Sequence, residues 1–440
     1  MNHAGVLGLG TFAVTAVLAT GATTVMGEGA VRQMRAASQA VSVARAPASV
    51  AGDVSGAAGA AYDSGYRRGV AVAGGSFGDG VLGSGRTAMT NATPGEYGRD
   101  WFYDVDGEHR TDDRGLAYLA GRGHRLIRVD FRWERLQPSL RGRLDPAEVR
   151  RITAMLDAAA RNGMQVILDC HNYGHYKAAG SPDVSSAQGG WPIGDDNLPA
   201  AAFADFWRRA VAQWGDHPAV WGWELMNEPV AMGDDGGTRW RRASQAAVSA
   251  IRGAERPGRA RAILVGGYNW SRVQDWDRTN GAPWINDPLG DPDRLIYTAH
   301  HYWDAGGDSS YGADDPRHLS AGPSGHAERI VAELREFTSW LRRHDVRGAI
   351  TEVGWPDNAA AIAWNAVAEQ WFREADAARL HVTAWATGAA WGDYELAVYE
   401  ARPGSWSWHG GDVIDTPNVQ AEVLELHPSN HFADLPTRAH

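Results

Sequence analysis

Short apolar runs that alternate with longer helical patterns constrain the fold of this chain more than any other feature of its sequence. Eight such runs follow one another, each with the composition of a buried strand. They are GVAVAG (69–74), RLIRVDF (125–131), MQVILDC (164–170), VWGWELM (220–226), AILVGG (262–267), RLIYTAH (294–300), RGAITEV (347–353) and VTAWA (382–386). Helical patterns lie between them, over 145–161, 201–214, 238–252, 325–343 and 359–378.

Strand–helix repeats of this kind predict parallel strands that are joined by right-handed crossovers. Eight of them close naturally into a barrel, so we predict the α/β class and a (β/α)8 TIM barrel. An open, doubly wound sheet is the alternative. Such a sheet usually carries a G-x-G-x-x-G loop after its first strand, and the glycine-rich segment GGSFGDGVLGSG (74–85) lacks that spacing.

The ends of the chain differ in composition from its middle. Residues 4–27 are uncharged and mostly apolar or small, which is typical of an export signal and is also long enough for a membrane anchor. A soluble N-terminal helix is the third interpretation. We predict a signal peptide or anchor over 1–27, an Ala/Gly-rich linker over 28–65, the barrel over 66–428 and a C-terminal tail over 429–440. Export makes the protein secreted or cell-surface, and we expect a monomer.

Composition excludes several classes of protein. The chain of 440 residues has 42 basic and 53 acidic side chains, and its net charge of −11 argues against a nucleic-acid partner. Its one cysteine, Cys170, excludes a disulfide scaffold and a cysteine-rich zinc site. Twenty tryptophans suit the flat faces of sugars and crowded cores equally well.

Polar and aromatic side chains gather where the predicted strands end. In a (β/α)8 barrel the catalytic residues come from the carboxyl ends of the strands. Six of the eight predicted strands carry such residues there. In chain order they are Arg128, then Asp169 to Tyr173 with His171 among them, Asn227 and Glu228, His300 to Trp303 with Tyr302 among them, Glu352, and Trp385.

Two carboxylates are the most informative of these residues. Glu228 ends the fourth predicted strand and Glu352 ends the seventh, so they face each other across the mouth of a closed barrel. Glycoside hydrolysis needs two carboxyl groups that flank the scissile bond. Asn227 is placed to bond a sugar 2-hydroxyl, and Arg128 and Tyr302 are placed to keep Glu352 ionised.

Six segments resemble those of one enzyme family, in the order in which that family has them. They are LIRVDFRWERLQP, VILDCHNYG, WELMNEP, TAHHYWD, ITEVGWP and TAWATGAAWGDY. The chain therefore resembles glycoside hydrolase family 5, the cellulase family of clan A, from about Arg68 to about Pro428. The family's second-strand segment often has proline where this chain has Asp130.

The resemblance implies the site and its chemistry. It makes Glu228 the acid/base and Glu352 the nucleophile of a retaining hydrolase that needs no cofactor. The retaining mechanism places the two carboxyl groups about 5–5.5 Å apart. It makes the substrate-binding residues Arg128, His171, Asn227, His300, Tyr302 and Trp385. The implied substrate is a β-linked polysaccharide or oligosaccharide. An endo-β-1,4-glucanase is favoured, with a mannanase, a xylanase or an exo-β-glucosidase as alternatives.

Other interpretations of the same residues remain open from sequence. A metal hydrolase would use His171 with His175, or His300 with His301, but no metal motif is present, and we predict no metal site. No G-x-S-x-G elbow follows a predicted strand, which argues against a Ser-His-Asp hydrolase. Cys170 lies on an apolar run, so we interpret it as a buried thiol and not as a nucleophile. A non-catalytic carbohydrate-binding protein is the alternative of another class. Paired aspartates at 195–196, 234–235 and 314–315 could bind calcium, but they lack the ligand spacing of a dedicated calcium loop, so solvated loops are the favoured interpretation. The tryptophans Trp133, Trp303, Trp355 and Trp391 either line outer sugar subsites or pack in the core.

Overall fold

The computed structural model describes residues 65–77, 97–98, 100–178, 180–182, 189–304, 306–307, 309, 311, 324–357, 361–389, 391, 394–401 and 413–430. They belong to one compact unit, Tyr62–His440. The predicted signal or anchor over 1–27 and nearly all of the predicted linker lie outside these residues. So do the tail beyond residue 430 and the aspartates at 314–315.

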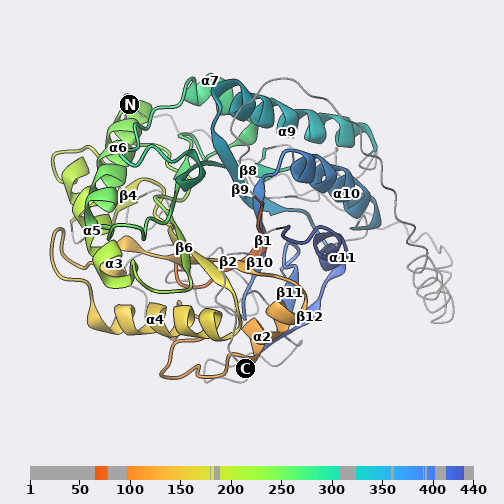
Figure 1. Cartoon of the computed structure of the whole chain (residues 1–440), viewed down its shortest axis with the longest axis horizontal. Helices are drawn as coiled ribbons and strands as arrows, with labels where there is room; N and C mark the ends of the chain where they lie inside the picture. The colour runs from red at the N-terminus through yellow and green to blue at the C-terminus, as the bar shows by residue number, and fades with distance from the viewer. Residues whose placement is uncertain are drawn as a thin grey trace, which may run out of the picture. The chain divides into compact units, whose positions relative to one another are not determined.

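Eight parallel strands form the centre of the molecule (Figure 1). Each predicted apolar run overlaps one of them. The strands are β1 (Arg68–Val72), β2 (Leu126–Phe131), β3 (Gln165–Cys170), β6 (Val220–Glu224), β7 (Ala262–Gly266), β8 (Leu295–Tyr302), β9 (Arg347–Gly354) and β10 (His381–Thr387). They pair in this order, and β1 also pairs with β10 in parallel, which closes the sheet. The predicted barrel is confirmed, and the open doubly wound sheet is excluded.

Helices surround the barrel on its outer side (Figure 1). They are α2 (Arg114–Gly121), α3 (Trp133–Leu136), α4 (Pro146–Arg161), α5 (Ala200–Trp214), α6 (Gly236–Ala254), α7 (Trp276–Asn280), α9 (Ser324–His344), α10 (Ala361–Ala377) and α11 (Val419–Leu426). Helix α4 illustrates the local causes. Asp145 caps it by accepting from the amides of Ala147 and Glu148, Pro146 begins it, and Ile152 and Leu156 are buried against the barrel.

Smaller elements decorate the connections. The hairpin of β4 (His175–Tyr176) and β5 (Trp191–Pro192) follows β3, and β11 (Tyr399–Ala401) and β12 (Ile414–Pro417) extend the sheet beyond β10. Short 3₁₀ turns, η2 (Val273–Asp275) and η3 (Pro292–Arg294), precede α7 and β8. In the part of the chain that is described, no helix combines the length and the apolar character needed to cross a membrane.

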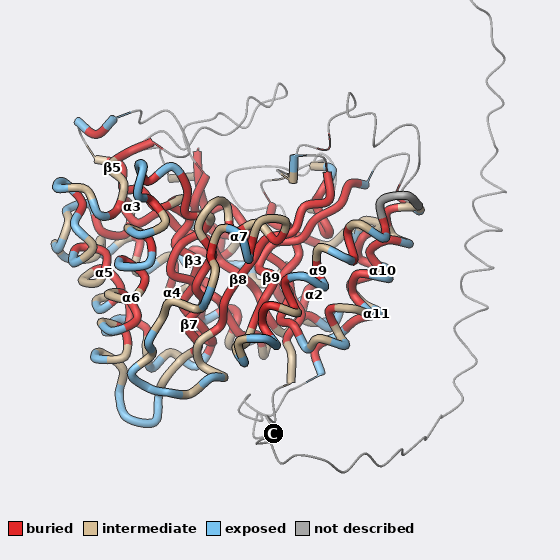
Figure 2. The backbone as a smooth tube through the Cα atoms, turned by 90° about the horizontal axis from the view of Figure 1, so that it is seen from above, coloured by how far each residue is buried: buried red, intermediate tan, exposed pale blue. Residues whose placement is uncertain are grey.

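The strands carry apolar side chains at one end of the barrel interior and polar side chains at the other. A cluster at the amino-terminal ends consists of Leu126, Ile167, Trp221, Ala262, Leu264, Ile296 and Ala349. Side chains two apart on a strand share a face, so Arg128 and Asp169 lie above Leu126 and Ile167 on the inward face. Figure 2 shows the buried strands at the centre and the exposed residues on the helices and loops. Apolar side chains therefore close the amino-terminal end of the barrel interior, and polar side chains lie toward its carboxyl-terminal end.

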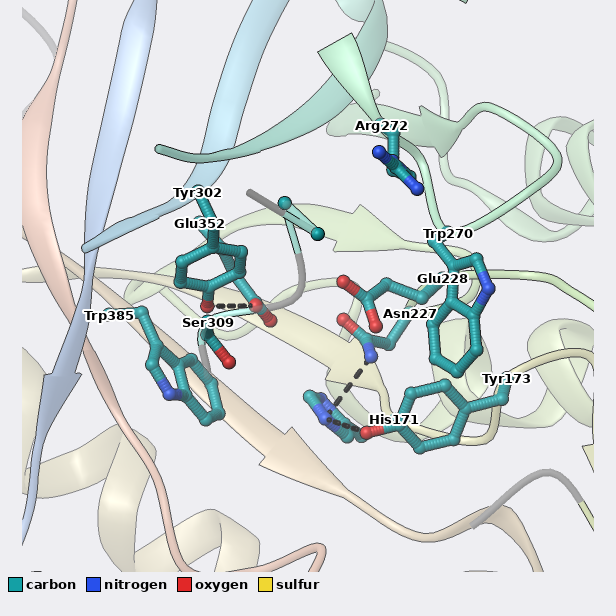
Figure 3. A pocket seen from close by; sticks show the side chains of 12 residues that line it. His171, Tyr173, Asn227, Glu228, Trp270, Arg272, Tyr302, Ser309, Glu352 and Trp385 are labelled. Atoms are coloured by element: carbon teal, nitrogen blue, oxygen red, sulfur yellow. Dashed lines mark hydrogen bonds between the residues drawn. The ribbon is translucent and has the colours of Figure 1, made fainter. Parts of the chain in front are cut away.

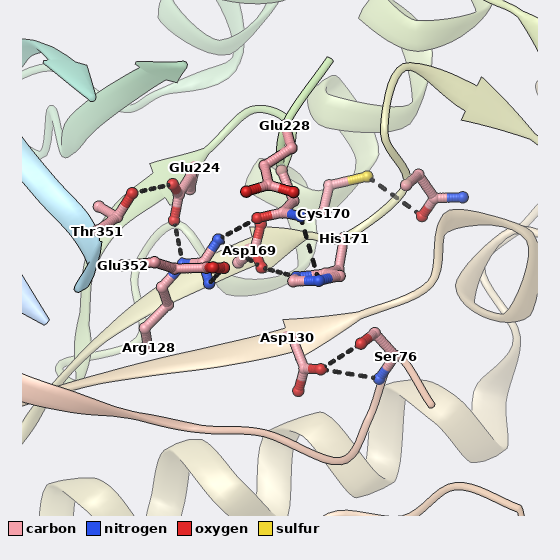
Figure 4. Close-up of polar contacts among 12 residues, drawn as sticks. Ser76, Arg128, Asp130, Asp169, Cys170, His171, Glu224, Glu228, Thr351 and Glu352 are labelled. Atoms are coloured by element: carbon pink, nitrogen blue, oxygen red, sulfur yellow. Dashed lines mark hydrogen bonds and ion pairs between the residues drawn. The ribbon is translucent and has the colours of Figure 1, made fainter. Parts of the chain in front are cut away.

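Asp130 shapes the loop that follows β1. Its carboxylate accepts hydrogen bonds from the amides of Gly74, Gly75 and Ser76, each at 3.1 Å, and from the Ser76 hydroxyl (Figure 4). Gly75 is required here, because a Cβ would lie 2.3 Å from the Asp130 carbonyl oxygen and 2.4 Å from the Tyr103 ring. The departure from the family's proline thus supplies an acceptor that fixes this loop.

Asp130→Ala should lower the free energy of unfolding by about 3 kcal/mol, because three amides in a closed site lose their acceptor. Asp130→Asn keeps one carbonyl oxygen and should lose about half as much. Urea unfolding followed by tryptophan fluorescence measures both. An alanine variant as stable as the parent would show that water replaces the carboxylate.

Candidate active site

Glu228 and Glu352 lie at the carboxyl-terminal end of the barrel, after β6 and at the end of β9. One oxygen of Glu228, one oxygen of Glu352 and a ring nitrogen of His300 all lie within 4.8 Å of one another. This separation is shorter than the 6.5–9.5 Å that an inverting glycosidase needs for a water molecule. The site therefore has the spacing for direct attack by one carboxylate.

Glu352 is held by donors on both of its oxygens. Arg128 Nη1 donates to Oε1 and the Tyr302 hydroxyl donates to Oε2, each at 2.7 Å. Burial acts to raise the pKa of this carboxyl. The charges of His300 and Arg128 outweigh burial, so the pKa of Glu352 lies below its ordinary value. The carboxylate is therefore ionised at neutral pH.

Glu228 has the opposite character. Burial raises the pKa of Glu228, and the charge of Glu352 adds to this rise, although the contact with His300 opposes it. The His300 Nδ1 lies 2.7 Å from Glu228 Oε1 and 3.4 Å from Glu352 Oε2. The side chain of Glu228 is 15% exposed, compared with 5% for Glu352, so the more protonated carboxyl is also the more open one.

A chain of hydrogen bonds fixes the state of His300. The Thr351 hydroxyl donates to Glu224 Oε1 at 2.7 Å, so its oxygen is free to accept from His300 Nε2 at 3.2 Å. With Nε2 protonated, His300 Nδ1 and Glu228 Oε1 share one proton between them. Burial acts to lower the pKa of His300, but Glu352 and Glu228 raise it above its ordinary value. The two glutamates thus favour the protonated form of His300.

Arg128 organises the floor of the site (Figure 4). It is buried and contacts Glu224 at 2.6 Å, Asp169 at 3.0 Å and the Asn227 amide oxygen at 2.8 Å, in addition to Glu352. The guanidinium of Arg128, on β2, therefore orients residues from β3, β6 and β9 and Asn227 just after β6.

His171 and Asn227 form a second layer of contacts. His171 Nδ1 lies 2.7 Å from Asp169 Oδ2, which makes Nδ1 the donor and Nε2 an acceptor. Asn227 Nδ2 donates to that Nε2 at 3.1 Å, and the Tyr173 hydroxyl lies 3.2 Å from it. Hydrogen bonds thus hold both the oxygen and the nitrogen of the Asn227 amide.

A cavity of about 440 Å³ opens above these residues (Figure 3). It is lined by His171, Tyr173, Asn227, Glu228, Trp270, Arg272, Tyr302, Gly306, Gly307, Ser309, Glu352 and Trp385. Six of the eight predicted site residues line it. The other two, Arg128 and His300, lie beneath and contact the glutamates. All eight predicted residues are brought together at one end of the barrel.

Sequence reasoning missed Trp270, Arg272 and the two glycines Gly306 and Gly307, because they follow strands by several residues. Non-glycine residues with positive φ mark this rim: Tyr173 at 55°, Glu228 at 44° and Trp270 at 63°. Such backbone conformations are uncommon outside glycine and cluster at functional sites. A turn with asparagine before tryptophan is the one signal that could have pointed to Trp270.

The tryptophans divide between the site and the core. Trp385 stacks on His171 with a centroid distance of 5.8 Å, lines the cavity and precedes a cis peptide bond. Trp391 packs against Trp385 at 5.6 Å and stays partly exposed. Trp133, Trp303 and Trp355 are fully buried, so the interpretation of these three as subsite residues is wrong. They point outward between strands and helices, where Trp303 stacks on Trp355 at 5.3 Å.

The alternative chemistries find little support in this geometry. Burial raises the pKa of the Cys170 thiol well above its ordinary range, which makes it a poor nucleophile. His175 Nδ1 lies 3.0 Å from a backbone oxygen, and His301 lies between Glu333 and Trp371. Glu228, His300 and Glu352 are the group of possible metal ligands found among the described residues, and His171 is not in it.

A closed barrel with two facing carboxyl groups at this spacing has the geometry that a retaining glycosidase needs. The sequence model of the cellulase family, glycosyl hydrolase family 5, matches residues 86–390. The chain belongs to this family. It is therefore a retaining glycoside hydrolase, and the resemblance found from sequence is confirmed. Family membership also argues against a non-catalytic binding protein.

Named relatives and solved structures agree with this assignment. Endo-beta-1,4-glucanase B of Aspergillus niger is 26% identical over 344 residues, which cover 76% of this chain and 88% of that protein. Cel5A, an endoglucanase of Pseudomonas stutzeri solved with cellobiose, is 31% identical with a TM-score of 0.65 and covers 82% of this chain and 92% of its own. The endo-beta-1,4-glucanase Xac0029 of Xanthomonas axonopodis pv. citri is 27% identical with a TM-score of 0.61, covering 82% and 98%.

Proposed function

We propose that this protein is an endo-acting β-1,4-glucanase in which Glu352 is the nucleophile and Glu228 is the acid/base. The observation that carries the assignment of roles is the opposite shift of the two pKa values, below the ordinary range for Glu352 and above it for Glu228. Neighbouring carboxyls whose environments push their pKa values apart take different roles in acid–base catalysis.

In the first step, Glu352 Oε attacks the anomeric carbon while Glu228 gives its proton to the leaving oxygen. The bond from carbon to the leaving oxygen breaks as the bond to Glu352 forms. In the second step, Glu228 takes a proton from water, the water oxygen attacks the same carbon, and Glu352 leaves. The proton from water restores Glu228 for the next cycle, and His300 holds the Glu228 carboxyl in place through its Nδ1. Asn227 and His171 contact the sugar that is attacked, and Trp385 forms the apolar floor beneath it.

The assignment to β-1,4-glucan rests on the relatives, which are named endo-β-1,4-glucanases. A panel of carboxymethylcellulose, mixed-linkage glucan, mannan and xylan, with sizing of the products, tests it. We expect a rapid fall in the viscosity of the two glucans and a mixture of oligosaccharides. Cleavage of mannan or xylan alone would overturn the assignment of β-1,4-glucan as the substrate. Release of glucose or cellobiose only, with little fall in viscosity, would overturn the endo action.

The dependence of activity on pH follows from the two shifts. The enzyme needs Glu352 ionised, so kcat/KM should fall as pH drops through the lowered pKa of Glu352. It also needs a proton on Glu228, so kcat/KM should fall as pH rises through the raised pKa of Glu228. On an aryl cellobioside with a good leaving group, Glu228→Gln should keep the acidic limb and lose the basic limb. Retention of both limbs in that variant would contradict the assignment.

We propose that the polypeptide is exported and that residues 66–428 are its catalytic domain. A polysaccharide cannot cross a membrane, so its hydrolysis has to take place outside the cytoplasm. The apolar, uncharged segment at 4–27 is suited to direct export, either as a cleaved signal or as an anchor. Fractionation of cells that express the full chain, with N-terminal sequencing of the mature protein, separates the two. Full-length protein found only in the cytoplasm would refute export.

A further inference from the structure

Arg272 is a cation in the cavity wall that has no charged partner among the described residues. Its side chain lines the cavity, yet none of the carboxylates in the described part of the chain lies within ion-pair distance of it. Its Nε is buried without an acceptor. Arg128, in contrast, is satisfied by three carboxylates. A buried donor of a charged group that lacks an acceptor is costly, so the position of Arg272 calls for a ligand.

The backbone holds Arg272 in this position. It follows three residues with positive φ, Asn269 to Ser271, at the end of β7. The Asn269 amide donates to the Pro229 carbonyl at 2.9 Å, and the His300 amide donates to the Ser271 carbonyl at 2.8 Å. Across from it, a Cβ on Gly307 would lie 3.3 Å from Arg272 Nη2, so a glycine there leaves room for the guanidinium.

Arg272 lies on the side of the cavity that receives the leaving sugar, an inference that rests on the proposed function. Figure 3 shows Glu228, Trp270 and Arg272 on one side, and Glu352, Tyr302 and Trp385 on the other. The sugar attacked by Glu352 lies over Trp385, and the leaving oxygen has to point to its proton donor, Glu228. The departing part of the chain therefore runs toward Trp270 and Arg272, where Trp270 packs at 5.9 Å from Tyr173.

The chemistry of a guanidinium identifies the ligand that fits best. It presents a planar set of N–H donors that matches a carboxylate in a bidentate arrangement. The principal influences on the pKa of Glu228 are burial, His300, Glu352 and His171, and Arg272 is not among them. Its charge is thus available to the substrate. We propose that Arg272 is a specificity residue that binds a carboxylate on the leaving-group side of a β-1,4-glucan, so that acidic glucans are preferred to neutral ones.

Cello-oligosaccharides with altered reducing ends test this directly. Oxidation of the reducing end to an aldonate gives one carboxylate, and reduction to an alditol gives a neutral open-chain end of nearly the same shape. We expect the parent enzyme to cleave the aldonate with a higher kcat/KM than the alditol, for the chain length that places the end beside Arg272. Arg272→Gln should lower this ratio about tenfold, and Arg272→Lys should retain part of it. Arg278→Gln, which removes an exposed arginine that pairs with Asp275, is the matched control.

A second pair of substrates distinguishes the source of the carboxylate. Carboxymethylcellulose carries acidic substituents along the chain, and hydroxyethylcellulose carries neutral ones. A selective loss on the first polymer places the bound carboxylate on an internal substituent, and a selective loss on the aldonates places it at a chain end. Equal losses on acidic and neutral substrates, or no loss, would overturn the proposal. If the parent enzyme cleaves none of these glucans, the proposed function itself has failed.

Discussion

Glu352→Ala should abolish hydrolysis of both polysaccharide and aryl glycoside, with kcat lowered by about 10⁴-fold or more. The loss is the same for both substrates, because neither can form a covalent intermediate without this carboxylate. The fold should survive, since Arg128 keeps its contacts with Glu224 at 2.6 Å and Asp169 at 3.0 Å. Kinetics on glucan and on 2,4-dinitrophenyl β-cellobioside measure the effect, and a thermal melt checks the fold.

Adding azide to the Glu352→Ala variant tests whether Glu352 is the nucleophile. The truncated side chain leaves space on the face from which Glu352 attacks, and azide entering there should give an α-glycosyl azide by a single inversion. The control is Glu352→Gln, which keeps the volume of the side chain and should be inactive with and without azide. A β-glycosyl azide from the alanine variant would reverse the two assignments. Proton NMR of the parent reaction should show the β-anomer first.

The positions of the eight predicted site residues were accessible from sequence for a physical reason. A parallel barrel brings every strand end to one face, so identifying the strands also identifies which residues meet. Arg128, Glu228 and Glu352 are separated by 100 residues or more in all three of their pairings, yet each lies on an apolar run or within two residues of its end. The strands could be identified because burial makes their sequences apolar, and closure of the barrel then brings their ends together.

Residues outside the strands could not be located in the same way. Trp270 and Arg272 lie in a turn whose left-handed backbone depends on contacts with Pro229 and with His300. Those contacts exist only after the barrel has closed. The interpretation of the buried tryptophans as subsite residues is wrong for a different reason. Trp303 and Trp355 directly follow β8 and β9 and pack against α10, whereas Trp385 lies within β10 and lines the cavity. One position of register decides which side of a strand a residue faces.

Glu228→Ala should separate the two substrates that Glu352→Ala treats alike. Hydrolysis of glucan should fall by about 10³- to 10⁴-fold, because the leaving sugar needs a proton in the transition state. An aryl cellobioside with a good leaving group needs no such proton, so the covalent intermediate should still form. That intermediate should then accumulate, since no base activates water for the second step. A burst of dinitrophenol followed by slow turnover is the expected kinetic signature.

Azide again decides between a catalytic role and a structural one. It needs no general base, so it should speed turnover of the accumulated intermediate and give a β-glycosyl azide. Glu228→Gln is the matched control, because it preserves an oxygen acceptor toward His300 Nδ1, which lies 2.7 Å from the native carboxylate, and cannot donate a carboxyl proton. It should show the same burst and the same selective loss on glucan. Equal losses on glucan and aryl glycoside, without a burst, would mean that Glu228 positions the site through His300 instead of transferring the proton.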